Sequence, residues 1–201
     1  MPTLASLRVK IADDLHRGDL DTQISDAITN AIRRYNRERL WFLEGTATLT
    51  LAASTSSYDL PTDFRAVDSV LLNTSGRLYP LDQVSYNEID SEDDGTFTGD
   101  PSQYAIYGKK IRFYPTPQSA NSTVVSYLKA LDEPSAAGSN SWTEEGYDLI
   151  RYAAEKELYR NVLRNPEMAQ MSYDGEREAF QSLTVEHIQR TSTGRLVKSG
   201  F

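Results

Sequence analysis

Apolar residues recur at helical spacing near both ends of the chain and at a spacing of two in the middle. One stripe predicts a short amphipathic helix over residues 3–17, which Gly18 ends; it consists of Leu4, Leu7, Ile11 and Leu15. A second stripe predicts a helix over residues 20–40, and it consists of Ile24, Ala27, Ile28, Ala31, Ile32 and Tyr35. The chain therefore opens with two helices that each have one apolar face.

From Gly45 onward, polar and apolar side chains alternate, which is the period of a half-buried strand. The alternation predicts strands over residues 46–51, 67–72, 77–81 and 123–129. Turn-forming residues follow the first strand at positions 54–57. This part of the chain is therefore expected to form a small β module.

A hairpin is predicted over residues 103–114, because Gly108-Lys109 is a two-residue loop of a type favoured between antiparallel strands. With this turn, the opposing pairs are Tyr107 with Lys110, Ile106 with Ile111, and Tyr104 with Phe113. The register places the apolar side chains on one face and leaves Lys110 and Arg112 on the other. A shift by one residue would mix the two faces, so the register is well specified.

Helical spacing returns after a small and polar linker over residues 134–141. A helix is predicted over residues 143–164, with a stripe of Leu149, Ile150, Ala153, Ala154, Glu157, Leu158 and Val162. Asn165-Pro166 breaks it, and a final helix runs to about residue 189. Residues 190–201 contain Arg and Lys but no carboxylate side chain, and they are expected to form an extended arm.

These elements predict an α+β protein: an antiparallel helical bundle with an inserted small antiparallel β module and an extended C-terminal arm. Two N-terminal and two C-terminal helices form the bundle. The expected boundaries are residues 1–43 for the N-terminal helices, 44–132 for the β module, 133–189 for the C-terminal helices and 190–201 for the arm.

Charge and composition exclude several classes of function. The chain has 29 acidic and 21 basic residues and a formal net charge of -8, which opposes general binding of nucleic acid. The protein could still surround DNA without binding it tightly. It contains no Cys and only two His, His16 and His187, so disulfides and a metal cluster are not expected. It also has neither an apolar run of membrane-spanning length nor a signal region, so we expect synthesis in a cytoplasm and no membrane partner.

Catalytic motifs do not stand out. The chain has no Gly-x-Ser-x-Gly turn and no phosphate-binding Gly loop, and its adjacent carboxylates, such as Glu144 and Glu145, are common in any acidic protein. We therefore expect no enzymatic activity and no cofactor.

An acidic stretch lies between Leu78 and Gly108, and it contains Asp82, Glu88, Asp90, Glu92, Asp93, Asp94 and Asp100. Residues 90–95 resemble the first half of an EF-hand calcium loop, but the twelfth position, which needs a bidentate Glu, is Pro101. Our interpretation is a solvated acidic loop, with a cation site over residues 88–100 as the alternative.

Two basic segments each allow two interpretations. One segment consists of Arg33, Arg34, Arg37 and Arg39. These side chains either complement the dipole of the second helix and face water, or bind phosphate or the carboxylates of a neighbouring subunit. The arm is either a frayed terminus or a segment that orders on a partner, anchored by Leu196, Val197 and Phe201 and steered by Arg195 and Lys198.

The order of several motifs adds a resemblance to these patterns. They are Tyr58-Asp59-Leu60-Pro61-Thr62-Asp63-Phe64-Arg65, Tyr79-Pro80-Leu81, Pro101-Ser102-Gln103-Tyr104-Ala105-Ile106-Tyr107-Gly108, Ile111-Arg112-Phe113-Tyr114-Pro115-Thr116-Pro117 and Leu149-Ile150-Arg151-Tyr152-Ala153-Ala154. In this order, and with helices on both sides, they resemble the head-to-tail adaptor proteins of tailed bacteriophages, especially those of short-tailed phages.

The resemblance implies a structural virion protein that forms a dodecameric ring beneath the portal, around the DNA exit channel. Its partners would be the portal protein, a downstream tail tube or nozzle protein, other copies of itself and, through proximity alone, DNA. The portal-binding residues would be those of the arm, Arg190, Arg195, Leu196, Val197, Lys198 and Phe201. The inter-subunit residues would be Arg33, Arg34, Arg37 and Arg39. The alternative is a distal tail or baseplate component that binds a protein or a glycan.

Overall fold

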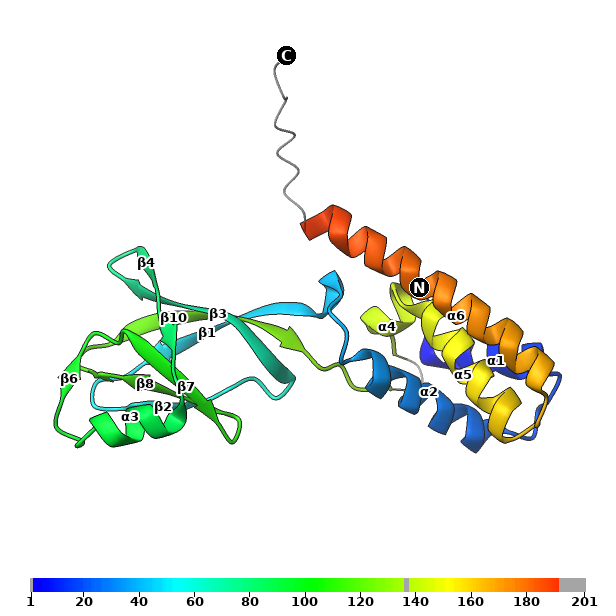
Figure 1. Cartoon of the computed structure of the whole chain (residues 1–201), viewed down its shortest axis with the longest axis horizontal. Helices are drawn as coiled ribbons and strands as arrows, with labels where there is room; N and C mark the ends of the chain where they lie inside the picture. Colours follow the sequence, from blue (N-terminus) through cyan, green and yellow to red (C-terminus); the bar gives the residue numbers. More distant parts are fainter. Residues whose placement is uncertain (1, 136–137, 192–201) are drawn as a thin grey trace, which may run out of the picture. The chain divides into compact units, whose positions relative to one another are not determined.

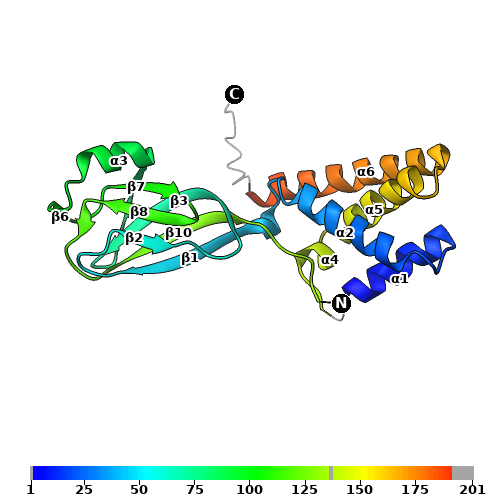
Figure 2. The same cartoon turned by 90° about the horizontal axis from the view of Figure 1, so that it is seen from below.

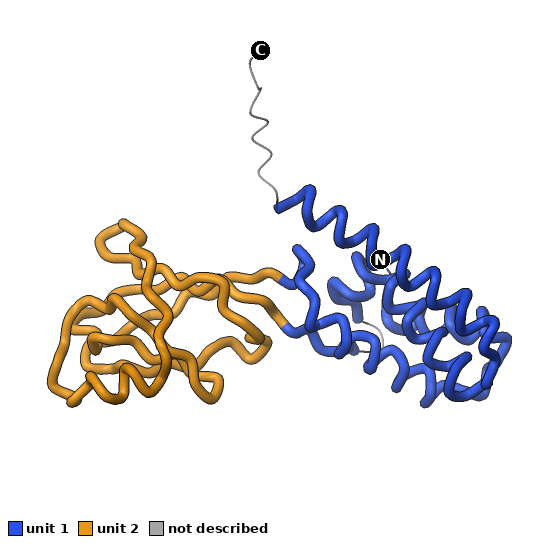
Figure 3. The backbone as a smooth tube through the Cα atoms, viewed as in Figure 1, with its two compact units in different colours: residues 1–43, 130–201 blue, residues 44–129 orange. Residues whose placement is uncertain are grey.

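The computed structural model describes residues 2–135 and 138–191, and the chain divides into two compact units. One unit, here called the helical unit, consists of residues 1–43 and 130–201 (Figure 3). The other, here called the β unit, consists of residues 44–129 and contains the sheets. Helices and antiparallel sheets occur together, so the predicted α+β class is confirmed.

The helical unit begins with α1 (Leu4–Leu15) and α2 (Asp21–Tyr35) (Figure 1). Both helices bury the predicted stripes. Thr3 caps α1: its hydroxyl accepts a hydrogen bond from the Ser6 N–H at 3.2 Å. The Ser6 hydroxyl in turn accepts a hydrogen bond from the Thr3 N–H at 2.9 Å. This reciprocal pair satisfies backbone donors that the first turn of a helix leaves unpaired, and so fixes where α1 begins.

Helix α2 ends at Tyr35, so the prediction that it continues to residue 40 is wrong. The side chain of the next residue, Asn36, bonds to distant parts of the unit. Its Nδ2 donates to the Leu131 carbonyl at 2.8 Å, and its Oδ1 accepts from the Leu131 N–H at 3.1 Å and the Trp142 Nε1–H at 3.0 Å. These contacts fix the chain as it leaves α2, and no local pattern could have indicated them.

The single helix predicted over residues 143–164 is divided into α4 (Ser141–Glu144) and α5 (Tyr147–Asn161). Gly146 lies between them, and a Cβ atom at this position would lie 2.7 Å from the ring of the fully buried Trp142. The final helix, α6 (Pro166–Thr191), starts where Asn165-Pro166 predicted a break. The Asn165 side chain accepts a hydrogen bond from the Met168 N–H at 3.1 Å, as an N-cap does.

All five of these helices contribute to one core. α5 packs along both α2 and α6 (Figures 1 and 2). The most deeply buried apolar side chains of this core include Leu4, Leu7, Ile11, Ile24, Ile28, Ile32, Trp142, Ile150 and Ala154. Burial of this apolar surface is the main contribution to the stability of the helical unit.

The β unit contains two four-stranded sheets and one pair of short strands. The first sheet has the order β1 (Glu44–Leu51), β10 (Asn121–Lys129), β3 (Phe64–Thr74) and β4 (Arg77–Pro80). The second has the order β2 (Ser57–Asp59), β8 (Lys110–Tyr114), β7 (Gln103–Tyr107) and β5 (Asp82–Gln83), and β6 (Thr98–Gly99) pairs with β9 (Thr116–Pro117). The core of this unit includes Leu51, Val70, Leu72, Tyr104, Ile111, Phe113 and Val125.

The predicted hairpin is confirmed by the pairing of β7 with β8. Tyr107 opposes Lys110, Ile106 opposes Ile111, and Tyr104 opposes Phe113. Gly108 and Lys109 both adopt positive φ angles, 57° and 64°, as the favoured two-residue hairpin turn requires. The register follows from the alternation of side chains and from this turn.

The acidic stretch is not a fully solvated loop as predicted, because part of it forms helix α3 (Tyr86–Glu92). Ser85 caps α3 by accepting the Glu88 N–H at 3.2 Å. Ile89 is fully buried, and α3 contacts β7, on which Ala105 is also fully buried. Arg112 of β8 forms ion pairs of 2.9 Å with both Asp90 and Asp93. Helix α3 therefore covers part of the sheet face on which Ala105 and Arg112 lie.

Candidate interaction surfaces

The four arginines predicted at the end of the second helix are all exposed, but they do not form one helical cluster. Arg33 and Arg34 lie in the last turn of α2, whereas Arg37 and Arg39 lie after it. Only the first two can therefore complement the helix dipole. The Arg37 N–H donates to the Arg34 carbonyl at 3.3 Å, so one further turn of chain places these two residues close together.

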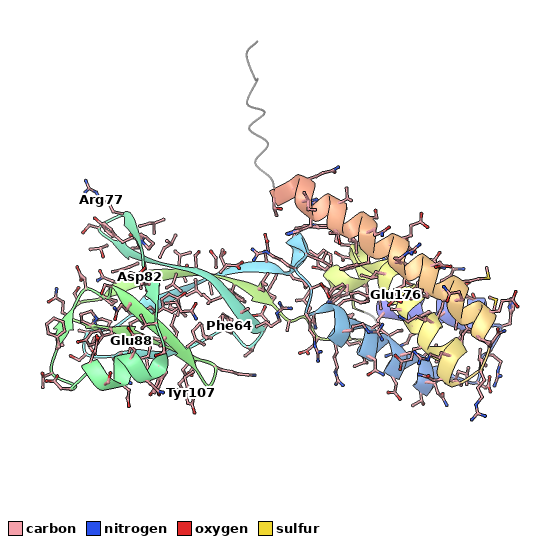
Figure 4. All side chains as sticks on the ribbon, viewed as in Figure 1. Phe64, Arg77, Asp82, Glu88, Tyr107 and Glu176 are labelled. Carbon is pink, nitrogen blue, oxygen red and sulfur yellow. The ribbon has the colours of Figure 1, made fainter. Side chains whose placement is uncertain are left out.

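Arg34 has a structural partner, Glu176, which is only 4% exposed. Glu176 lies on α6 and is labelled in Figure 4. An Arg34 Nη1 lies 3.0 Å from Glu176 Oε1, and the Tyr35 hydroxyl donates to the same oxygen at 2.7 Å. Lys156 of α5 forms an ion pair with the other carboxylate oxygen. Burial, together with the hydrogen bond to Glu176, raises the pKa of Tyr35 well above its usual range. The buried charge is thus fully paired, and it joins α2, α5 and α6.

A cleft of about 300 Å³ surrounds this carboxylate, lined by Arg34, Tyr35, Lys156, Tyr173, Glu176, Arg177 and Phe180. Three of these residues are cationic, and the one anionic residue is buried beneath them. Arg177 is exposed on α6. Arg34, Arg37, Lys156 and Arg177 are here called the basic flank.

On another side of α6 lies a larger groove of about 490 Å³, bounded by α4, the start of α5 and α6. Its carboxylates are Glu144, Glu145, Asp148, Glu178 and Glu186, and its one cation is Arg151. Arg151 is already paired, at 3.1 Å with Asp14 and at 3.4 Å with Asp148. The groove therefore keeps an excess of negative charge and is here called the acidic groove.

Helix α5 also contains a buried carboxyl group, Glu155, which is 5% exposed. Burial and a hydrogen bond with Asp14 raise the pKa of Glu155 to about 7, although the Arg151 guanidinium 4.0 Å away opposes this shift. Asp14 itself is less buried. Its partial burial raises the pKa of Asp14, but hydrogen bonds with Lys10, Glu155 and Arg151 outweigh this effect and hold the pKa below its usual value.

The first residue of the predicted arm belongs to α6. Arg190 is helical, in the last turn of α6, so the prediction that the extended segment starts at this residue is wrong. Its guanidinium donates to Glu186 at 2.6 Å and lies 4.6 Å from the centre of the Trp41 ring. Arg195, Leu196, Val197, Lys198 and Phe201 lie outside the described residues.

Exposed apolar side chains occur on both units. Near the end of α6, Val185 and Ile188 are 53% and 55% exposed and share one side of the helix, three residues apart. In the β unit, Leu78 and Tyr79 are exposed on β4. Tyr107, which Figure 4 labels, is 69% exposed, and its ring centroid lies 4.9 Å from that of Tyr86. Such side chains are typical of surfaces that contact other proteins.

Two further observations concern other kinds of site. Within residues 2–135 and 138–191, no three His, Asp or Glu side chains are grouped so that they could hold a metal ion. Over the same residues, no helix combines the length and the hydropathy that a membrane crossing requires.

The sequence model of a family described as SU10 adaptor protein matches residues 2–198. A search of curated proteins gives no similar sequence. The family match covers both units and extends beyond the last described residue of α6.

Proposed function

The chain belongs to the SU10 adaptor protein family, and from this premise we propose that it is the head-to-tail adaptor of a tailed bacteriophage. Its role as a structural adaptor of the virion follows from the family. In the finer proposal, twelve copies form a ring beneath the portal and connect the capsid to the tail around the DNA exit channel. The partners are the portal protein and a downstream tail tube or nozzle protein.

The extent of the family match is the observation that carries this proposal. A match over residues 2–198 includes the helices, the β unit and the basic segment after α6. It therefore describes the whole arrangement of the chain and not a single motif that unrelated proteins share.

Charge and exposed surface support the same role. A net charge of -8 disfavours binding to DNA phosphates, because contact would release few counterions. DNA could therefore pass through such a ring with little adhesion. The helical unit offers Val185 and Ile188, and the β unit offers Leu78, Tyr79 and Tyr107, as apolar contacts for separate partners.

Mixing the chain with the portal protein of the same phage tests the proposal directly. Mass photometry should show the portal ring gaining an equal number of 22.6-kDa chains, even where the free chain is a monomer. A portal from an unrelated phage is the control and should gain no mass. If both proteins are folded and no complex forms with the matching portal, the adaptor role is wrong.

The alternative role, a distal tail or baseplate component that binds a protein or a glycan, is favoured by the aromatic surface of the β unit. Tyr107, whose ring lies tilted against that of Tyr86, and Phe97, which is 56% exposed, provide flat apolar contacts. This role predicts binding to a purified distal tail protein or to host-surface glycans in place of portal binding.

A further inference from the structure

Helix α6 separates two surfaces of opposite charge. It lines the acidic groove with Glu178 and Glu186, and it lines the basic flank with Arg177. Consecutive residues on a helix point about 100° apart, so the neighbours Arg177 and Glu178 face different sides. The residues that α6 buries lie between the two sides, and they are Ala169, Ser172, Glu176 and Leu183.

A closed ring of identical subunits needs two different patches on each subunit that complement one another. A patch that only complemented itself would give pairs. The acidic groove and the basic flank are different, opposite in charge and present on the same unit, so they meet this requirement. We propose that the acidic groove of one copy receives the basic flank of the next copy, with Arg37 and Arg177 entering the groove. This inference rests on the proposed ring.

Charge and size both support this occupant. Two of the five groove carboxylates already have cationic partners, because Asp148 pairs with Arg151 and Glu186 pairs with Arg190. Glu144, Glu145 and Glu178 supply the remaining negative charge. Glu144, Glu145 and Asp148 are exposed within a short stretch of chain, so their mutual repulsion is relieved when a cation binds. Arginine side chains are long and planar and can bind carboxylates with two parallel hydrogen bonds. A volume of about 490 Å³ accommodates them.

The absence of cysteine from the natural sequence allows a direct test of the contact. Glu178→Cys and Arg37→Cys are prepared as separate proteins, mixed in equal amounts and oxidised with the portal present. We expect about tenfold more disulfide-linked dimer from the mixture than from either variant alone, because charge complementarity favours one orientation. Glu88→Cys, at an exposed position of α3 in the β unit, is the matched control partner and should give no enrichment. Equal cross-linking in every combination would overturn the proposal.

Charge reversal provides the second measurement. Glu145→Lys with Glu178→Lys reverses the groove, and Arg37→Glu with Arg177→Glu reverses the flank. Each pair alone should reduce the number of copies on the portal about tenfold, and all four changes in one chain should restore it, because the contact becomes complementary again. Circular dichroism confirms that each variant is folded. Asp82→Lys with Glu88→Lys is the control for added positive charge.

The outcomes separate this inference from the proposed function. If the unaltered chain does not bind the portal, the proposed function is wrong. The mixture of the two cysteine variants is then oxidised without the portal. If the mixture gives no more disulfide-linked dimer than either variant alone, the inference is wrong as well. If the unaltered chain binds the portal but the reversed groove and flank do not rescue one another, only the inference fails. This failure of the four changes to restore binding is also the result expected if the acidic groove binds the portal and not the next copy.

Discussion

Glu155 is the carboxyl group whose surroundings predict a pH dependence of stability. Its pKa is about 7 in the folded chain against an ordinary value of 4.5, so the folded state binds the proton more tightly than the unfolded state does. Stability should therefore be highest below the unfolded pKa and fall as the pH rises through about 7, by up to about 3 kcal/mol. Chemical denaturation at a series of pH values measures this fall.

Glu155→Gln should remove most of that dependence. The amide stays neutral, so the free energy of unfolding of the variant should change little between pH 5 and pH 8. The stability of the variant relative to the natural chain should therefore rise toward pH 8. Glu157→Gln, on the same helix but only partly buried, is the matched control and should keep the natural profile. Parallel pH profiles for the natural chain and Glu155→Gln would contradict the assignment.

Glu176 differs from Glu155 because its buried carboxylate is paired with two cations, Arg34 and Lys156. Glu176→Gln should lower the free energy of unfolding by about 2 kcal/mol, because Lys156 and Arg34 lose their counter-charge while remaining partly exposed to water. Glu178→Gln, at an exposed position on the same helix, should change stability by less than about 0.5 kcal/mol. Equal effects of the two substitutions would show that the buried ion pairs contribute nothing.

Neither buried carboxylate could be predicted from the sequence. Helical spacing placed Glu157 and Val162 in the apolar stripe of the helix, but Glu155 is the buried residue and Val162 is 39% exposed. A charged residue on an apolar face is ordinarily assigned to water. Glu155 is buried beside Arg151, and Glu176 is buried beside Lys156, Arg34 and Tyr35. Only the fold brings these partners together.

The break between α4 and α5 depends on a close approach that a helical pattern does not reveal. Gly146→Ala would place a Cβ atom 2.7 Å from the ring of fully buried Trp142, which has little room to move. We expect a loss of about 1–3 kcal/mol in the free energy of unfolding. At Gly18, a Cβ atom would meet nothing within 4 Å, so Gly18→Ala is the matched control and should be neutral or slightly stabilising. Thermal unfolding of both variants decides the matter.

Elements with a strong period could be predicted, and those with tertiary causes could not. The hairpin register followed from side-chain alternation around Gly108-Lys109. Helix α3 escaped prediction because Ile89 is its one buried residue, and a single apolar position shows no period. β2, β5, β6 and β9 are too short for alternation to be visible.

For the whole molecule, the basic segment after α6 is the part that the resemblance assigns to the portal. A chain that lacks residues 191–201 should stay folded, because the described core of the helical unit does not include them. It should fail to join the portal, because Arg195, Lys198 and the apolar residues around them are lost. Mass photometry with portal and circular dichroism of the free chain measure both expectations. If the truncated chain still joins the portal normally, the assignment of this segment to portal binding is wrong.

The pairing of β1 with β10 has a consequence for the ancestry of the chain. Glu44 opposes Leu128, so the points where the chain enters and leaves the β unit lie on neighbouring strands, about 5 Å apart. A short linker can bridge that distance, and replacing residues 44–129 by a few glycines should leave a helical unit that unfolds cooperatively. Failure of this shortened chain to fold would refute the idea. If it folds, the β unit is a cassette that a related phage could exchange for a different fold while the helices are inherited unchanged.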